Sequence, residues 1–169
     1  MNHWQQIVDA HIQWLVPSVR RIVGNDHDAE DVVQEVFVEA YSLAQRTEVE
    51  NWPGLLRRMS QRRAIDHLRR KARNKETASS DQLKQLPSNT DTADQIRDTN
   101  AQEDLLRDAL TKLSDRQADV FTFTYFESLS RGEIAATLEI SENAVSMALH
   151  KATKRLKSAL QNPHTTQEN

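Results

Sequence analysis

The sequence predicts an all-α protein: two small helical bundles joined by a flexible linker, the C-terminal one with a helix-turn-helix. Three observations predict this class. Gly and Pro, which form the turns of β-hairpins, number only three and four among 169 residues. Apolar residues recur at steps of three and four along most of the chain, as in amphipathic helices. Between residues 76 and 100 that pattern gives way to a polar stretch.

The composition excludes several kinds of site. Without Cys there is no disulfide, thiolate nucleophile or Cys-ligated metal. The six His form no HExxH motif or close pair and no Gly-rich phosphate loop occurs, so we expect no catalytic residue, metal or cofactor. No apolar run exceeds three residues, and the first residues lack a basic segment followed by an apolar one. We therefore expect a cytoplasmic protein with no membrane insertion.

The predicted N-terminal domain, residues 1–75, begins with two amphipathic helices. Apolar residues follow helical spacing over 7–23, where Pro17 is a position for a kink. A second apolar stripe runs over 29–41, and Asp28, with another Asp three residues later, resembles a capping box at its start.

The face opposite this second stripe is acidic. Residues 26–39 contain six Asp or Glu and no Lys or Arg. The Glu-x-x-His pattern of a di-metal bundle is absent, so a surface that docks a protein partner is favoured over a solvated face or an enzyme site. The candidate docking residues are Asp28, Glu30, Asp31, Gln34, Glu35 and Glu39.

The third helix, predicted over 55–73, is cationic. Residues 55–75 hold seven Arg, two Lys and one acid, whereas charged surface helices usually mix the two signs. Arg suits bidentate phosphate contact, and Trp52 and His67 add flat surfaces for an unpaired base. The pattern favours a nucleic-acid interface over a solvated face. Its candidate residues are Trp52, Arg57, Arg58, Arg62, Arg63, His67, Arg69 and Arg70.

Residues 76–100 are predicted to form the flexible linker, because so little apolar surface cannot offset the entropy of ordering. The C-terminal domain is predicted over 101–161, and a disordered tail over 162–169. Apolar stripes place two further helices before the helix-turn-helix, and the aromatic residues of 121–126, Tyr125 among them, are assigned to the core.

Helix starts in this domain are marked by Ser residues. Ser114 and Ser130 each have Gln or Glu three residues later, as in a capping box, and Ser141 precedes the last apolar stripe. A short helix over 131–138, a tight turn and a longer helix with a cationic outer face form a helix-turn-helix pattern.

This helix-turn-helix, Ser130 to Lys151, supplies the second set of DNA-binding candidates. At the start of the last helix Asn143 can pair with adenine and Met147 can pack on a thymine methyl, whereas later Lys residues suit phosphates. The candidate residues are Arg131, Asn143, Ala144, Ser146, Met147, His150, Lys151 and Lys154.

With these surfaces in place, the chain resembles the extracytoplasmic-function (ECF, group 4) sigma factors, a type within the sigma-70 family of bacterial RNA polymerase. Residues 28–37, Asp-Ala-Glu-Asp-Val-Val-Gln-Glu-Val-Phe, match the core-polymerase-binding segment of that family. Residues 64–70, Ala-Ile-Asp-His-Leu-Arg-Arg, look like its promoter −10 recognition helix. Residues 113–117, 125–127 and 133–135 look like its −35-binding domain.

The resemblance implies a role for each surface. Domain 1–75 would be sigma region 2-like: its acidic helix would dock on the polymerase clamp helices, and its basic helix, with the loop after Tyr41, would capture a flipped base and melt the −10 element. Domain 101–161 would be sigma region 4-like, with its last helix in the major groove at −35. The implied partners are core RNA polymerase, promoter DNA and often an anti-sigma factor. The implied function is to direct the polymerase to specific promoters and so initiate transcription.

The chain departs from the family pattern in both DNA-binding helices. Leu55-Leu56 and Arg62 stand where family members often have Trp-Leu and Asn, and Glu139 replaces the usual Gly of the turn. Asn143 to Leu149 lacks two cations and a Thr found in the common Gly-Thr-Val-Lys-Ser-Arg-Leu. The main alternative is a stand-alone helix-turn-helix regulator, which leaves the acidic and basic helices without a role. A sigma relative that only binds proteins, and an enzyme, are weaker alternatives.

Overall fold

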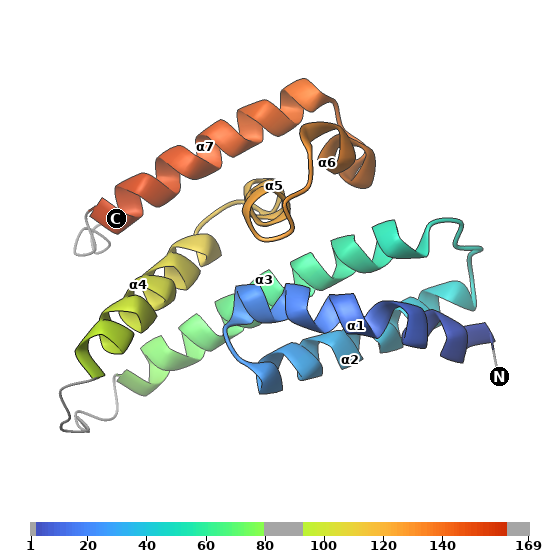
Figure 1. The fold of residues 1–169 in the computed structure, drawn as a ribbon, viewed down its shortest axis with the longest axis horizontal. Helices are drawn as coiled ribbons and strands as arrows, with labels where there is room; N and C mark the ends of the chain where they lie inside the picture. The colour runs from blue at the N-terminus through green and yellow to red at the C-terminus, as the bar shows by residue number, and fades with distance from the viewer. Residues whose placement is uncertain (1–2, 80–92, 162–169) are drawn as a thin grey trace.

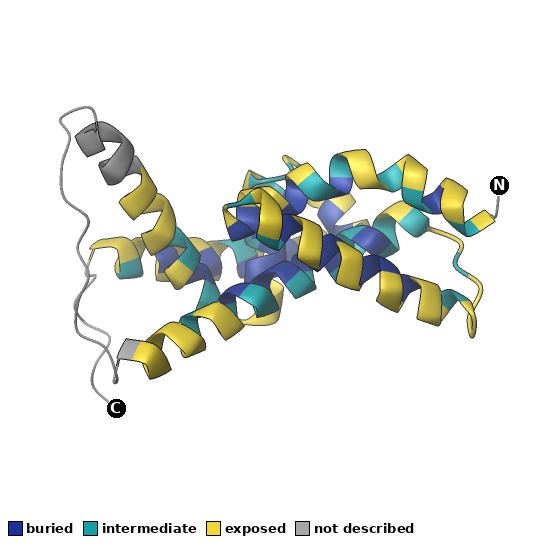
Figure 2. Ribbon diagram, turned by 90° about the horizontal axis from the view of Figure 1, so that it is seen from below, coloured by how far each residue is buried: buried dark blue, intermediate teal, exposed yellow. Residues whose placement is uncertain are grey.

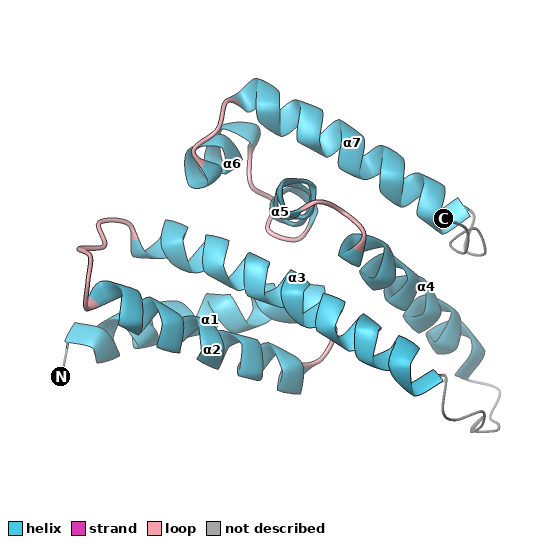
Figure 3. Cartoon of the chain, turned by 180° about the vertical axis from the view of Figure 1, so that it is seen from behind, coloured by secondary structure: helices cyan, strands magenta, loops and turns pink. Residues whose placement is uncertain are grey.

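The computed structural model describes residues 3–79 and 93–161 (Figure 1). Over these two stretches the backbone forms helices joined by short turns, with no strand, so the all-α prediction is confirmed (Figure 3). None of the described helices is both long and apolar enough to cross a bilayer. The helices are α1 (His3–Val23), α2 (Asp26–Ala44), α3 (Trp52–Ser79), α4 (Ala93–Thr111), α5 (Asp115–Tyr125), α6 (Arg131–Leu138) and α7 (Glu142–Gln161).

Helices α1, α2 and α3 pack together as an N-terminal bundle (Figure 1). Helix α1 runs without a break through Pro17, which is exposed. Leu15 of α1, Val36 of α2 and Ile65 of α3 are buried in one cluster. Full burial of an aliphatic side chain contributes roughly 1.5–3 kcal/mol, so the three apolar stripes hold this bundle together.

Helix α2 begins earlier than the sequence predicts. Gly24, at φ 95°, turns the chain after α1, and Asn25 is the N-cap of α2. The Asn25 side chain accepts a hydrogen bond from the backbone N–H of Asp28 at 2.8 Å. The capping box predicted at Asp28 is therefore wrong, because Asp28 already lies in the first turn of the helix.

The two helices that flank the predicted linker are longer than predicted. Helix α3 extends to Ser79 and α4 begins at Ala93, so both ends of the 76–100 stretch are helical. These ends contain Ala, Glu, Gln and Arg, whose good helix propensity outweighs the low apolar content that suggested a linker. Residues 80–92 and the predicted tail over 162–169 lie outside the described residues, and the division into domains stays a prediction.

The predicted caps of the C-terminal region have different outcomes. The Ser130 box is confirmed: Oγ of Ser130 accepts from the N–H of Glu133 at 3.2 Å, and the Glu133 carboxylate accepts from the N–H of Ser130 at 2.8 Å. Ser141 caps α7 by accepting from the N–H three residues later, at 3.1 Å. Ser114 is the N-cap of α5 but makes no side-chain capping bond, so the box predicted there is wrong. Glu139 ends α6 at φ 54°, a conformation for which Gly is the usual residue.

Of the aromatic residues of 121–126 assigned to the core, Tyr125 is exposed. Val120 and Phe123, three residues apart, are fully buried, whereas Tyr125 is 56% exposed. A position two residues after Phe123 lies on nearly the opposite face of a helix, which explains the exposure. Tyr125 packs instead against Phe121, with 4.7 Å between ring centroids.

The two helical regions share a hydrophobic core. Leu110 of α4, Ala118 of α5 and Leu156 of α7 belong to the same buried cluster as the α1–α3 bundle. Buried residues line the sides of the helices that face one another (Figure 2). A second cluster, which includes Phe123 of α5 and Ile134 of α6, lies between α5 and the helix-turn-helix. Helix α3 packs on α4, α5 and α6 as well as on α1 and α2, so it forms a large part of the contact between the regions.

Candidate docking and nucleic-acid interfaces

The predicted docking residues form an acidic ridge along the side of α2 that faces away from the buried stripe. A shallow groove runs along the ridge, and Val38 in its lining is 68% exposed. An exposed apolar side chain among carboxylates gives a partner protein both contact area and charge. All the predicted docking residues except Asp28 are exposed, namely Glu30, Asp31, Gln34, Glu35 and Glu39.

Asp28 has a structural setting different from the rest of the ridge. Its side chain is only 17% exposed and lies between α2 and α3, where it accepts a hydrogen bond from Lys71 Nζ at 3.0 Å and one from Asn25 at 2.8 Å. Nε2 of His67 is 3.2 Å from the same carboxylate. Burial alone raises the pKa of Asp28, but the contacts with Asn25, Lys71 and His67 outweigh it and hold the pKa well below its usual range. Asp28 therefore ties α2 to α3 as a carboxylate.

The positive charge of α3 is balanced inside the molecule. The sequence argument that so many like charges need an external polyanion is therefore incomplete, because the acids come from helices distant in sequence. Most cations of 55–75 form an ion pair with a carboxylate of the described residues, among them Arg57, Arg58, Arg62, Arg63, Arg69, Arg70 and Lys71.

Two of these arginines face α2 of their own bundle. Arg63 donates from Nε and Nη2 to Glu39 at 2.9 and 2.7 Å, and Nη2 of Arg70 is 3.7 Å from Glu35. The Glu39 hydrogen bond raises the pKa of Arg63. Glu35 and Glu39 are 45% and 48% exposed, so water and salt screen these pairs.

Four other arginines of α3 face the C-terminal region. Arg57 Nε donates to Glu127 at 2.9 Å, and Arg58 Nη1 donates to Glu139 at 2.9 Å. Arg62 pairs with Asp115 and, at 3.1 Å, with Asp119. Arg69 Nη1 donates to Asp115 at 2.7 Å. Glu127 and Asp119 are only 6% and 10% exposed, so their pairs are better shielded from water than those facing α2.

Arg69 also holds the end of α4. Its Nη2 donates to the carbonyl of Leu113 at 2.9 Å and its Nε to the carbonyl of Thr111 at 3.2 Å. The last carbonyls of a helix lack partners within the helix, and a cation there also suits the helix dipole. A residue predicted to bind DNA therefore has a structural role in this arrangement.

The two aspartates opposite Arg62 have opposite pKa shifts. Burial raises the pKa of Asp119 to about 6, against the attraction of Arg62. The hydrogen bond from Arg69 is the main cause that lowers the pKa of Asp115, which is about half exposed. Asp119 thus carries an ionised carboxylate at neutral pH only at a cost in folding free energy.

An aromatic cluster lies where the α2–α3 loop meets α1. The Trp4 ring packs on Trp52, Tyr41 and Phe37, with centroids 5.6, 5.1 and 6.2 Å away. Trp52 is therefore half-buried in this cluster, whereas Tyr41, which the sequence assigns to the α2 stripe, is 44% exposed. The sequence analysis did not predict this cluster. The position of Trp4 beside the apolar stripe of α1 is the one feature of the sequence that could have indicated it.

The predicted −35 residues lie on α7, except Arg131, which begins α6. Among them Asn143, Met147, His150, Lys151 and Lys154 are exposed, and Met147 is 54% exposed. Arg131 is exposed as well, whereas Ala144 and Ser146 are half-buried. Ser146 Oγ accepts a hydrogen bond from Arg131 Nη1 at 3.1 Å, which links α6 to α7. The start of α7 thus presents polar and apolar groups, and cations follow later.

The fold defines a two-region helical protein with a C-terminal helix-turn-helix, and the comparisons give its family. The model for "Sigma-70 region 2" matches residues 7–74, and the model for "Sigma-70, region 4" matches residues 103–156. The ECF sigma factor SigL of Mycobacterium tuberculosis is 32% identical, with 92% of this chain and 87% of SigL covered. The chain belongs to the ECF sigma factors of the sigma-70 family.

Further relatives agree with this assignment. The RNA polymerase sigma-E factor of Streptomyces avermitilis is 30% identical, with 87% of this chain and 79% of the relative covered. The ECF sigma factor SigE of Mycolicibacterium smegmatis is 27% identical over 95% of this chain, which spans 62% of that relative. The solved structure of RpoE with the anti-sigma factor NepR from Bartonella quintana has the same fold, with a TM-score of 0.54 at 16% identity and coverage of 95% and 98%. CnrH in complex with the cytosolic domain of CnrY also gives 0.54, at 23% identity and coverage of 96% and 89%.

Proposed function

We propose that this chain binds core RNA polymerase through the α2 ridge and directs it to promoters with α3 and α7. The observation that carries the proposal is the separation of three surfaces on one fold: an exposed acidic ridge, a cationic helix beside it, and an exposed helix-turn-helix face. The protein would act by binding core polymerase and promoter DNA, in the compartment that holds the polymerase. The polymerase would catalyse RNA synthesis. A stand-alone regulator has no use for the ridge.

The α2 ridge is the proposed polymerase contact. Glu30, Asp31 and Gln34 are exposed, and the one ion pair of Asp31 among the described residues is with His27 at 3.6 Å. These residues contribute little to the packing of α2, so their exposure fits a docking role. Glu35 and Glu39, by contrast, also hold arginines of α3, which makes them poorer positions for a test.

The two DNA contacts are proposed on α3 and α7. The α2–α3 loop, with Tyr41 and Trp52 at its ends, would meet the −10 element, and the arginines of α3 would neutralise its phosphates. The start of α7 would read the −35 element in the major groove. The solved structures of RpoE and CnrH contain an anti-sigma factor and the cytosolic domain of CnrY, which supports a protein inhibitor as a further partner.

Charge reversal on the ridge tests the proposal. Asp31→Lys should weaken binding to core RNA polymerase by about tenfold or more, because a like charge facing a complementary surface is repelled. Asp9→Lys, on the exposed side of α1, is the matched control and should bind as the wild type does. Both affinity for core polymerase and transcription from a promoter template are measured, with helix content by circular dichroism. Equal binding by the two variants would contradict the docking role, and tight duplex binding by wild-type protein without polymerase would favour the stand-alone regulator.

A further inference from the structure

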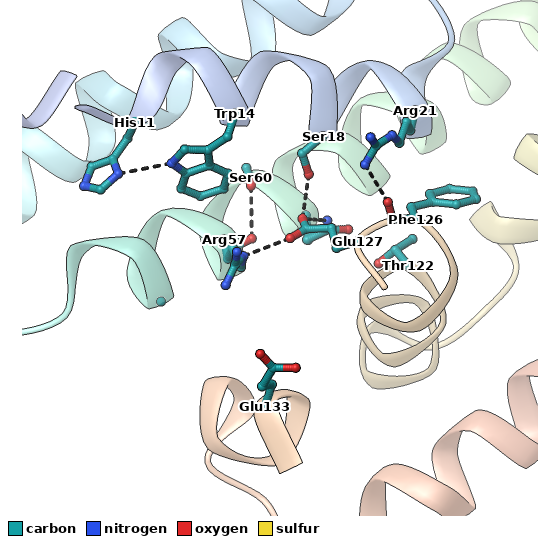
Figure 4. Close-up of polar contacts among 12 residues, drawn as sticks. His11, Trp14, Ser18, Arg21, Arg57, Ser60, Thr122, Phe126, Glu127 and Glu133 are labelled. Atoms are coloured by element: carbon teal, nitrogen blue, oxygen red, sulfur yellow. Dashed lines mark hydrogen bonds and ion pairs between the residues drawn. The ribbon is translucent and has the colours of Figure 1, made fainter. Parts of the chain in front are cut away.

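Glu127 joins the two helical regions. It lies in the turn after α5, and its carboxylate accepts hydrogen bonds from Ser18 of α1 and from Gln61 and Arg57 of α3 (Figure 4). The three donor–acceptor distances are 2.5, 2.6 and 2.9 Å. Only 6% of the Glu127 side chain is exposed. One acid of the C-terminal region thus occupies a socket made wholly of N-terminal side chains.

The socket is polar where a helix bundle would otherwise be apolar. Ser18 and Gln61 are 4% and 1% exposed, yet both are polar, and a buried polar group without a partner is costly. Glu127 is the partner that satisfies the Ser18 hydroxyl and the Gln61 amide N–H. Beside the socket, Arg21 donates to the carbonyl of Phe126 at 2.7 Å. The N-terminal bundle is therefore built to receive this turn.

We propose that Glu127 is a latch that holds the C-terminal region on α3 and withholds the cations of α3 from DNA. The proposal rests on the function proposed above, in which α3 contacts the −10 element. In the latched form the cations Arg57, Arg62 and Arg69 each face a carboxylate of the C-terminal region. A phosphate that approached them would meet those carboxylates as like charges, so the latched protein binds nucleic acid weakly.

Opening the latch would separate the hydrophobic core that the two regions share, but two features of the socket lower the cost of opening. Oε1 of Gln61 is buried and has no hydrogen-bond partner among the described residues, and opening would hydrate it. Opening would also return Glu127 and Arg57 to water, which offsets much of the loss of their ion pair. A surface that binds the C-terminal region, or a polyanion that binds α3, would therefore shift the protein from the latched to the open form.

The distance between the two regions tests the latch directly. Because the chain has no Cys, dyes can be attached at Gln13→Cys on α1 and Ser158→Cys on α7, both exposed positions. Glu127→Lys faces Arg57 with a like charge and should lower energy transfer between the dyes. Ser18→Ala removes one donor from the other side of the interface and should lower it less. Asp9→Lys, with the same change in charge, should leave it at the wild-type value.

Binding of single-stranded oligo(dT) tests the masking. Glu127→Lys should bind at least about tenfold more tightly than Asp9→Lys, because the apparent affinity rises with the fraction of open protein. The slope of the logarithm of its binding constant against the logarithm of salt concentration should also be steeper by about two, because about three more phosphates are neutralised. Circular dichroism of Glu127→Lys checks its folding; if helix is lost, Ser18→Ala decides by the same two measurements.

The outcomes separate the latch from the proposed function. Unchanged energy transfer in both Glu127→Lys and Ser18→Ala overturns the latch, with no reference to polymerase or promoter. Lower transfer without tighter oligo(dT) binding than in Asp9→Lys overturns the masking. Failure of the wild-type protein to bind core polymerase would overturn the proposed function and would leave the transfer result standing.

Discussion

The arginines on the two sides of α3 lie in different surroundings. Toward α2, Arg63 and Arg70 pair with Glu35 and Glu39, which are about half exposed. Toward the C-terminal region, the acids are Glu127 and Asp119, at 6% and 10% exposure, together with the more exposed Asp115 and Glu139. Exposed pairs contribute little to stability, whereas loss of one partner from a buried pair costs several kcal/mol. The burial of the acid, which is not visible in the sequence, therefore separates structural arginines from surface ones.

The largest expected effect compares two adjacent arginines. Arg69 is 22% exposed and bonds Asp115 and the carbonyls of Thr111 and Leu113, whereas Arg70 is 47% exposed with one acid at 3.7 Å. Arg69→Ala should lower the free energy of unfolding by roughly 3 kcal/mol, because it leaves the two carbonyls without their donor and removes the hydrogen bond to Asp115. Arg70→Ala should lower it by less than about 0.5 kcal/mol. Urea denaturation followed by circular dichroism measures both; equal losses would contradict the distinction between the two sides of α3.

A second expectation concerns pH and the acid opposite Arg62. In the unfolded chain the pKa of the Asp119 carboxyl is 3.8, and burial raises it to about 6 in the folded protein. The folded state therefore holds this proton more tightly, and the stability it gives is present at low pH and lost as pH rises from about 4 to 6. Between pH 4 and 7 the wild type should lose up to about 3 kcal/mol relative to Asp119→Asn, because each tenfold difference in proton affinity between the two states corresponds to about 1.4 kcal/mol.

The measurement is chemical denaturation at a series of pH values, read as the difference between wild type and variant. Asp9→Asn, an exposed position on α1, is the matched control and should run parallel to the wild type. If Asp119→Asn also runs parallel to the wild type, Asp119 is not held in a desolvated site, and the shielding claimed for the C-terminal side of α3 is wrong.

The helices followed from the sequence because the apolar stripes set the buried faces. Spacing alone placed Leu15 and Val36, of the stripes over 7–23 and 29–41, on the buried faces, where the structure also has them. The box at Ser130 was equally visible, since both of its partners are local. The assignment to the sigma family came from short motifs on these helices, and the family comparisons confirm it.

The partners of α3 could not be predicted in the same way. Arg57 and Glu127 are 70 residues apart, and local spacing says nothing of such pairs. The same limit applies to Asp28, which looked like part of a uniform acidic ridge and instead bonds Lys71. Capping at Ser114 failed for a related reason: the sequence offers the residues, but the backbone geometry decides whether the hydrogen bond forms.

A third expectation extends the comparison of exposed and constrained side chains to α7. Asn143 is exposed at the start of the helix, where Asn can pair with adenine in the major groove. In complexes with core polymerase, Asn143→Ala should lose roughly 1–3 kcal/mol of preference for one base of the −35 element. Lys151→Ala should weaken binding to all sequences alike and lower the salt slope by about one. Both effects are measured by competition among −35 duplexes in which each base pair is varied in turn. If Lys151→Ala changed the base preference and Asn143→Ala did not, the two residues would have the opposite roles.

The smallest expected effect concerns two serines at N-caps. Ser130 makes both bonds of its capping box, and it begins α6, the helix that ends at Glu139, the partner of Arg58. Ser130→Ala should therefore lower the free energy of unfolding by about 1 kcal/mol, since an N-cap side chain satisfies a backbone N–H that nothing else bonds. Ser114→Ala makes the same chemical change at the start of α5, where no capping bond exists, and should alter stability by less than about 0.5 kcal/mol. Thermal unfolding of the two variants side by side tests this; a larger loss at Ser114 would mean that α5, and with it the acids facing Arg62, depends on a cap that the structure does not contain.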